Sequence, residues 1–239
     1  MQNIGIISVE EAKKQGVLEN IINVNPGTLK DPNGFLQHSY DSALIIQDIL
    51  NRAIYYYPED FKFRVDRNEI EIAAYLHDIG RPLQKDQLFH ELRGAEYIEQ
   101  EGKRIRLVLT ENHKKQLYRI AETIRSHFVV YEQFNMPEFK DRINEFNNID
   151  PDLLLPITWN QKFLVYAELS NVAGQRMTPQ ERMEELEFRY SNNPQYKDEL
   201  FLKAFMLGKE RIFRICNTVD RLIQGKMDER EIKRYGFLM

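Results

Sequence analysis

The sequence predicts an all-α protein, and two patterns support that fold class. Side chains that cap helix N-termini stand three residues before a glutamate at Ser8, Asp66 and Thr178, which is the sequence signature of a helix start. Apolar residues recur at three- and four-residue intervals along much of the chain, whereas the alternating pattern of a half-buried strand is scarce. We therefore expect most helices to bury one apolar face.

Two helices are predicted in the first half of the chain. Between about residues 35 and 57, apolar residues approximate a helical stripe, and His38 falls near its beginning. In the next helix the apolar face ends on His77, which should therefore point toward the interior, and Gly80 supplies a plausible stop. Asp78 is then expected near a helix end, beside a pocket.

The same arrangement returns later in the chain. One apolar face ends on His127 and another ends on Glu168. A long segment through about residue 224 is predicted as a packing helix, with Gly208 as a candidate point of interruption. Separate helices would thus deliver imidazole and carboxylate groups inward, where a metal would compensate for the cost of burying them.

Bulk properties limit the classes of partner and the compartment. The 239 residues suffice for one substantial core. The net charge of -4 disfavours extended nucleic acid as a partner and suits small phosphorylated compounds better. The single cysteine, Cys216, lies among apolar residues, so we expect a buried thiol, no intramolecular disulfide and a reducing compartment. No signal-peptide pattern and no apolar run of roughly 18 residues is apparent, so we expect a cytoplasmic protein without a membrane partner.

The dipeptide His77-Asp78 is the most informative motif, because adjacent imidazole and carboxylate groups can hold and bridge metal ions. Borderline divalent metals suit such donors, so manganese, iron, cobalt, nickel and zinc all remain candidates. Four of the five histidines and one later acid form an ordered set with this dipeptide: His38, His77, Asp78, His90, His127 and Glu168.

In this order the chain resembles the HD superfamily of metal-dependent phosphohydrolases, of the type with the motif His-Asp-Ile-Gly. Three stretches carry the resemblance, at residues 77–80, 90–96 and 166–168. Members of the superfamily most often have aspartate where this chain has Glu168. Glutamate is still an oxygen ligand, although its extra methylene shifts the carboxylate.

The resemblance implies a division of the chain into three parts. Residues 35–190 would form the metal-binding helical bundle. Residues 1–34 would be an N-terminal elaboration, and residues 191–239 would add C-terminal helices packed on the same domain.

The resemblance also implies a ligand set and a reaction. A first metal would be held by His38, His77, Asp78 and Glu168. A second, bridged by Asp78, would be completed by His90 and His127, whose presence favours two ions over one. A metal-activated water would then hydrolyse a phosphate ester or anhydride of a nucleotide or another small phosphorylated metabolite.

Three arginines are candidate phosphate ligands. Arg81 directly follows the His-Asp-Ile-Gly motif and is, with Asp78, a candidate catalytic residue. Arg93 lies one helical turn beyond His90. Arg176 follows the acidic motif at a position where some superfamily members have an arginine. A solvated arginine or a salt bridge is the alternative interpretation at each position.

Two other functions remain open from the sequence. A catalytically degenerate helical domain would bind a ligand or partner without turnover, and a di-iron oxygenase would use a similar ligand set to activate oxygen. Retained metal with phosphate release would favour the hydrolase over both. The substrate and the oligomeric state are not predicted.

Overall fold

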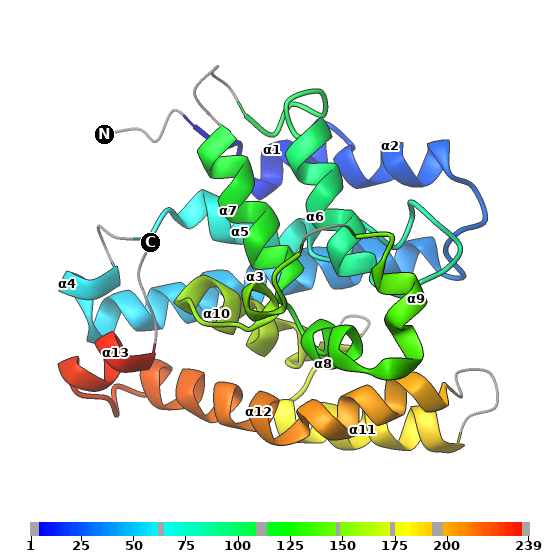
Figure 1. Cartoon of the computed structure of the whole chain (residues 1–239). Helices are drawn as coiled ribbons and strands as arrows, with labels where there is room; N and C mark the ends of the chain where they lie inside the picture. The colour runs from blue at the N-terminus through cyan, green and yellow to red at the C-terminus, as the bar shows by residue number, and fades with distance from the viewer. Residues whose placement is uncertain are drawn as a thin grey trace.

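The described residues of this computed structural model are 5–61, 65–108, 114–146, 149–172, 175–192 and 198–235, and they are mainly helical (Figure 1). The predicted all-α class is confirmed. The three predicted helix starts are confirmed as well, since Ser8, Asp66 and Thr178 each accept a hydrogen bond from the backbone amide three residues later. No described helix has the length and the apolar character that crossing a membrane requires.

The first five helices bring in His38 and His77. The longest begins at Pro32, slightly before the predicted start, because Asp31 accepts a hydrogen bond from the amide of Gly34 and proline occupies the first helical position. The bounds are α1 (Val9–Lys14), α2 (Val17–Val24), α3 (Pro32–Tyr56), α4 (Pro58–Phe61) and α5 (Arg67–Leu76).

The middle of the chain pairs two helices and then continues through short turns. The pair α6 and α7 pack on each other, and α7 also packs on α5. The bounds are α6 (His90–Glu101), α7 (Lys114–Arg125), α8 (Val130–Asn135), η1 (Pro137–Phe139), α9 (Lys140–Ile143) and η2 (Pro151–Leu154).

The last third of the chain supplies a buried helix and a layer that covers it. The buried helix packs on α3 on one side and on α12 on the other. Two short strands pair antiparallel, with Asn171 opposite Arg176. The bounds are α10 (Trp159–Glu168), β1 (Asn171–Val172), β2 (Gln175–Arg176), α11 (Pro179–Asn192), α12 (Glu199–Ile223) and α13 (Glu229–Tyr235).

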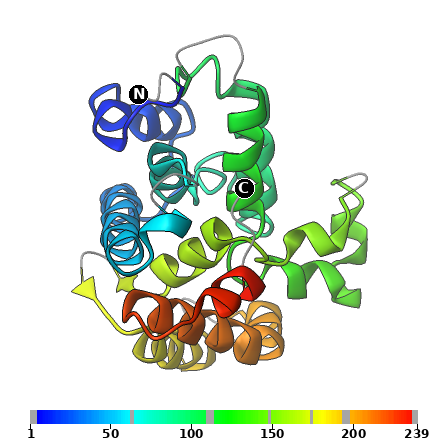
Figure 2. The same ribbon diagram turned by 90° about the vertical axis from the view of Figure 1, so that its left-hand side faces the viewer.

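The helices form layers around α3, which runs across the middle of the molecule. Above it in Figure 1 lie α5, α6 and α7, while α11 and α12 form the lower edge, and Figure 2 shows the same order from the side. Because α10 contacts α3, α5, α7 and α12, this helix lies where the layers meet. Its last residue, Glu168, is thereby placed among the ends of α5 and α7.

The predicted interruption at Gly208 is wrong, because α12 is continuous from Glu199 to Ile223. Glycine serves a close approach here. A Cβ at this position would lie 2.8 Å from Cδ of Glu132, whose carboxylate accepts two hydrogen bonds from Arg211 at 2.8 and 2.7 Å. The glycine therefore lets α8 pack closely against α12.

Cys216 lies on the covered face of α12, as predicted. Its side chain is buried among apolar residues, and burial raises the pKa of the thiol to about 12. A neutral thiol in such surroundings is chemically unreactive.

Candidate metal centre

The four histidines of the predicted set lie on four different helical segments. His38 lies in the second turn of α3, and His77 is the C-terminal cap of α5. His90 is the first residue of α6, and His127 follows the end of α7 by two residues. The packing of these helices brings all four imidazoles toward one place, where the centroids of neighbouring rings are 5.0 to 5.7 Å apart.

Three of the four rings are oriented by a carbonyl oxygen three residues earlier in the chain. Nδ1 of His77, His90 and His127 lies 2.7, 3.0 and 2.7 Å from the carbonyl oxygens of residues 74, 87 and 124. A carbonyl oxygen can only accept, so Nδ1 carries the proton and donates. In the neutral ring, Nε2 is then an unprotonated acceptor that can bind a metal.

His38 is oriented by a side chain instead. Its Nδ1 lies 2.7 Å from Oδ1 of Asn171, whose own Nδ2 donates a hydrogen bond to Ser42 at 3.0 Å. The amide oxygen of Asn171 can only accept, so Nδ1 of His38 carries the proton and donates. His38 therefore also presents an unprotonated Nε2 in its neutral form.

In the first half of the centre, which consists of His38, His77 and Glu168, three acceptor atoms face one another. Nε2 of His38 lies 3.2 Å from Nε2 of His77, and Oε2 of Glu168 lies 2.9 Å from the former and 3.0 Å from the latter. With both rings neutral, no proton lies between these atoms. Such a contact is unfavourable unless a cation or an additional proton occupies it.

The charges around the first half favour a cation. Burial by itself would lower the pKa of His77, but Asp78 and Glu168 outweigh burial and raise that pKa to about 9. Burial would raise the pKa of Glu168, yet His38 and His77 hold it well below its usual value. The carboxylate is therefore ionised, and the metal-free centre holds a proton that a metal would displace.

The second half, which consists of His90, Glu91 and His127, is less tightly assembled around Asp78. Oδ1 of Asp78 lies 2.8 Å from Nε2 of His90 and 3.8 Å from Nε2 of His127. Oδ1 of Asp78, Nε2 of His90 and Oε2 of Glu91 are all buried without a hydrogen-bond partner among the described residues. Burial also lowers the pKa of His127, which keeps its ring neutral.

Asp78 lies between the two halves and is ionised. Burial alone would raise its pKa, but Arg81, His77 and His90 hold the pKa well below its usual value. Its Oδ2 atom lies 2.7 Å from Nε of Arg81 and 3.7 Å from Nε2 of His77, while Oδ1 faces His90. One carboxylate thus reaches both halves.

The residues present fit divalent metal ions. Ligand atoms bound about 2.0–2.2 Å from one metal lie roughly 3 Å apart, which matches the separations in the first half. The described residues form three overlapping groups of imidazole and carboxylate donors that could hold an ion, and each group has its ligand atoms within 4.8 Å of one another. The unpartnered buried atoms of Asp78, His90 and Glu91 would gain a partner from such an ion.

Gly80 controls how closely Asp78 approaches α6. It does not have the left-handed conformation of a glycine helix cap, so its role differs from the predicted stop. A Cβ at Gly80 would lie 1.9 Å from the carbonyl oxygen of His90 and 2.8 Å from the amide of Gly94. Only glycine lets the segment after His77 pack so close to the first turn of α6.

Two residues of the centre were missed by the sequence interpretation. Glu91 is buried and belongs to the second half, and its position next to His90 was the available signal. Asn171 orients His38 from a position three residues after Glu168. Its signal was weaker, because asparagine after a helix end is common in turns.

The structure separates the three candidate arginines. Arg81 lies beside Asp78, with its Nε atom buried and its side chain as a whole 35% exposed. Arg93 donates a hydrogen bond at 2.6 Å to the carbonyl oxygen of Asp86. Arg176 is largely exposed and lies 3.7 Å from Asp48. The polar contacts seen for Arg93 and Arg176 thus run to these partners rather than to the candidate ligands.

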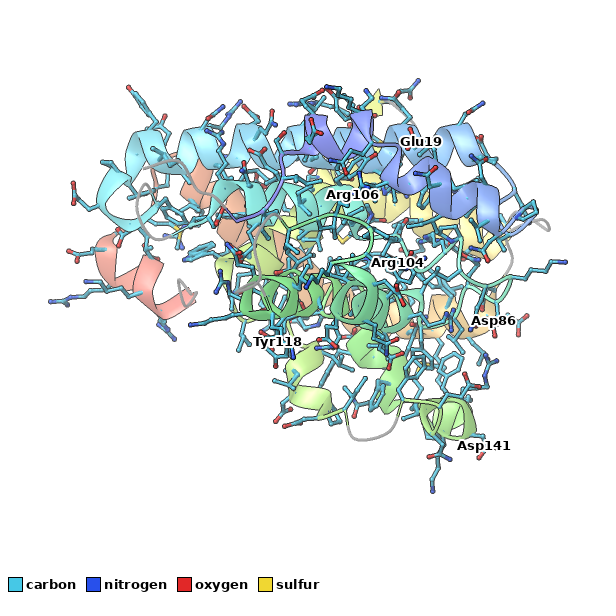
Figure 3. The ribbon with its side chains drawn as sticks, turned by 90° about the horizontal axis from the view of Figure 1, so that it is seen from above. Glu19, Asp86, Arg104, Arg106, Tyr118 and Asp141 are labelled. Atoms are coloured by element: carbon cyan, nitrogen blue, oxygen red, sulfur yellow. The ribbon has the colours of Figure 1, made fainter. Side chains whose placement is uncertain are left out.

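A cavity of about 470 Å³ lies apart from the histidines. It is lined by apolar residues of α2, by Tyr97 on α6 and by the turn that carries Arg104 and Arg106. Figure 3 labels these two arginines and also Glu19 of α2. None of its lining residues belongs to the centre. The cavity therefore says nothing about the substrate of the histidine centre.

One family model matches part of the chain. Residues 35–143 match the family model described as the HD domain. No curated protein matches the chain, and no solved structure matches it. The matched range contains all four histidines and Asp78, and it ends before Glu168.

Proposed function

We propose that this chain, which carries an HD domain, is a metal-dependent phosphohydrolase that cleaves a phosphate ester or anhydride of a nucleotide or another small phosphorylated metabolite. One observation carries the proposal. Four imidazoles, each oriented through Nδ1 so that Nε2 is its metal-binding atom, converge with the ionised carboxylates of Asp78 and Glu168. This donor set suits divalent transition metals.

The elongated shape of the centre supports two ions. The three groups of donors overlap through His77 and His127 and extend from His38 to Glu91. The Oδ1 atom of Asp78 faces His90, and its Oδ2 atom lies near His77. Asp78 is therefore the residue that would bridge the ions. Bound divalent cations would supply an activated water and would offset the charge that develops on phosphoryl oxygens.

The protein's own groups have separate parts in this proposal. Asp78 stays ionised and anchors the centre. Arg81 pairs with it and is partly exposed, so the guanidinium can turn toward a phosphoryl oxygen and donate hydrogen bonds. The buried imidazoles hold their tautomers through backbone carbonyls, which keeps the centre preorganised.

The negative net charge of the chain supports a small substrate. A formal charge of -4 gives no general attraction for an extended polyanion. Local positive charge at Arg81 is enough for a single phosphate group.

The first test is the metal content of protein purified without chelators, measured by elemental mass spectrometry. We expect about two transition-metal ions per chain in the wild type, and almost none in Asp78→Ala. Asp141→Ala is the matched control, because Asp141 projects from the surface of α9 (Figure 3) and should leave the metal content unchanged.

The second test is phosphate release from nucleoside mono-, di- and triphosphates and from sugar phosphates. Turnover that is lost in Asp78→Ala and retained in Asp141→Ala would support the proposal. Bound iron with oxygen-dependent turnover and no phosphate release would instead identify an oxygenase. Protein that binds no metal even after reconstitution with manganese or iron would contradict catalysis and leave a ligand-binding domain.

A further inference from the structure

The outward side of α12 carries apolar side chains that no described element covers. Leu200, Met206, Leu207 and Phe213 are 39, 48, 63 and 41% exposed. The helix lies at the lower edge of the molecule in both Figure 1 and Figure 2. Residues 200 and 207 are seven positions apart, and so are residues 206 and 213, which places all four on one side of the helix. An exposed group of large apolar residues is typical of an interaction surface.

Charged residues on the same side follow an order that is symmetric about one point. Lys203 and Glu210 are equidistant from the midpoint between Met206 and Leu207. Their side chains are exposed, at 52% for the lysine and 84% for the glutamate. In a second copy of the helix that runs in the opposite direction about this midpoint, the glutamate therefore lies opposite the lysine and the lysine opposite the glutamate.

The same symmetry relates two further pairs of exposed residues on this side. Glu199 and Arg214 are equidistant from that midpoint, and they too have opposite charge. Leu200 and Phe213 form a third such pair, and both are apolar. Two identical helices can pair antiparallel with this midpoint as their centre. Each of these residues then lies opposite a residue of the other helix that has the opposite charge or is also apolar.

We propose that two copies of this chain associate through an antiparallel pairing of their α12 helices about a two-fold axis between Met206 and Leu207. These two residues of both copies meet at the axis. Each copy's Lys203 faces Glu210 of the partner subunit, so the charge pair forms twice. Residues 199–223 lie outside the matched HD domain, so the interface is formed by a helix added to that domain.

The antiparallel arrangement is selected by charge. A parallel pairing in register would place Lys203 against its own copy and Glu210 against its own copy, and like charges at close range are repulsive. Within one chain Lys203 contacts Glu138, and Arg214 lies 3.9 Å from Glu210. Exposed ion pairs of this kind are weak, so they can exchange for contacts across an interface.

Sedimentation equilibrium of the full chain tests the proposal. The wild type should show a monomer–dimer equilibrium at micromolar concentration. Glu210→Lys places a second lysine opposite Lys203 and should weaken the dimer by about tenfold or more. The double variant Lys203→Glu with Glu210→Lys restores opposite charges and should recover most of the affinity. Glu59→Lys on α4 is the matched control, since Glu59 is exposed on another part of the surface, and it should change nothing.

Cysteine cross-linking tests the position of the axis. Leu207→Cys lies next to its own copy and should form a disulfide-linked dimer under mild oxidation. Asn217→Cys is exposed on the same side of the helix, but at 1.5 Å rise per residue the two copies would be roughly 30 Å apart and should not cross-link. The native Cys216 is buried and does not compete.

A strictly monomeric wild type at about 100 μM would overturn the proposal, since symmetric dimers of functional strength form well below that concentration. So would a dimer that is insensitive to Glu210→Lys, because another surface would then hold it. Failure of the double variant to regain affinity, or equal cross-linking at positions 207 and 217, would exclude the proposed register. Circular dichroism of each variant confirms that the chain is folded.

Discussion

In the first half of the candidate metal centre, three acceptor atoms of His38, His77 and Glu168 lie within 3.2 Å of one another, whereas in the second half Nε2 of His127 lies 3.8 Å from Asp78. The first half comes from α3, α5 and α10, three helices that pack on one another. The second half comes from the ends of α6 and α7, and its buried acceptor atoms Nε2 of His90 and Oε2 of Glu91 have no hydrogen-bond partner among the described residues. Preorganisation therefore differs between neighbouring parts of one site.

This difference implies an order of metal binding. A site whose ligands already lie at coordination spacing loses little conformational freedom when an ion binds. The second half must contract before its ligands reach that spacing. We therefore expect the first half to bind its ion more tightly than the second.

The largest effects on metal affinity should come from two single variants, each of which removes one candidate ligand from a different half. His38→Ala should lower the affinity for the tighter ion by about 100-fold or more, since even an orienting partner of a ligand is worth 10–100-fold. His90→Ala should leave that ion in place and remove the weaker one. Titration with manganese, followed by elemental analysis of each variant, measures both affinities.

Two results of this titration would contradict the comparison. If each variant lost both ions to the same degree, the halves would be one cooperative site. If His90→Ala removed the tighter ion, the order of binding would be reversed. Melting curves without metal show whether either variant is merely unfolded.

A smaller effect should come from the group that orients His38. Asn171→Ala removes the acceptor for Nδ1 of this ring, so the imidazole can adopt the wrong tautomer, and the tighter ion should bind about 10–100-fold more weakly. Ser42→Ala is the matched control, since it removes only the outer hydrogen bond to Asn171 and should cost less. Manganese affinity that is equal to wild type in Asn171→Ala would show that the orientation of His38 does not depend on this contact.

The smallest effects on metal should come from the arginines. Arg81→Ala should reduce phosphate release by roughly 10- to 100-fold if the side chain donates to a phosphoryl oxygen, because charged hydrogen bonds are worth about 1.5–3 kcal/mol, while both ions stay bound. Arg176→Ala should change phosphate release by less than about twofold, because Arg176 is exposed and its ion pair with Asp48 is weak. Steady-state rates at saturating metal separate the two outcomes. A large loss in Arg176→Ala alone would mean that the substrate lies nearer β2 than the centre.

The sequence predicted the helical class and the helices that carry the candidate ligands, because apolar spacing and capping residues act locally. The histidines and Asp78 could be singled out because their order along the chain resembles that of a known superfamily. The roles of the ligands remain predictions. The position of Gly80 could be noticed as well, but not its purpose, which depends on the approach of a backbone segment ten residues away.

Contacts between distant segments were beyond the reach of the sequence. The pairing of Asn171 with His38 joins residues 133 positions apart, and no local pattern encodes it. Arg93 was a candidate phosphate ligand because it lies one turn after His90, yet its guanidinium instead holds the backbone at Asp86. Helical spacing gives the side of a helix on which a residue lies but not what a long side chain reaches.

Three of the four imidazoles take their orientation from a carbonyl only three residues away in their own segment. The carbonyls of residues 74 and 124 lie in the last turn of α5 and α7, where the regular helical amide donor is missing, and the carbonyl of residue 87 lies just before α6. Each of these ligands and its support are thus encoded in a stretch of four residues. Transplanting these short stretches to the helix ends of an unrelated bundle should carry the correct imidazole tautomers with them. By contrast, His38 would need a second, separately placed graft for Asn171, which makes it the hardest part of the centre to rebuild in a designed protein.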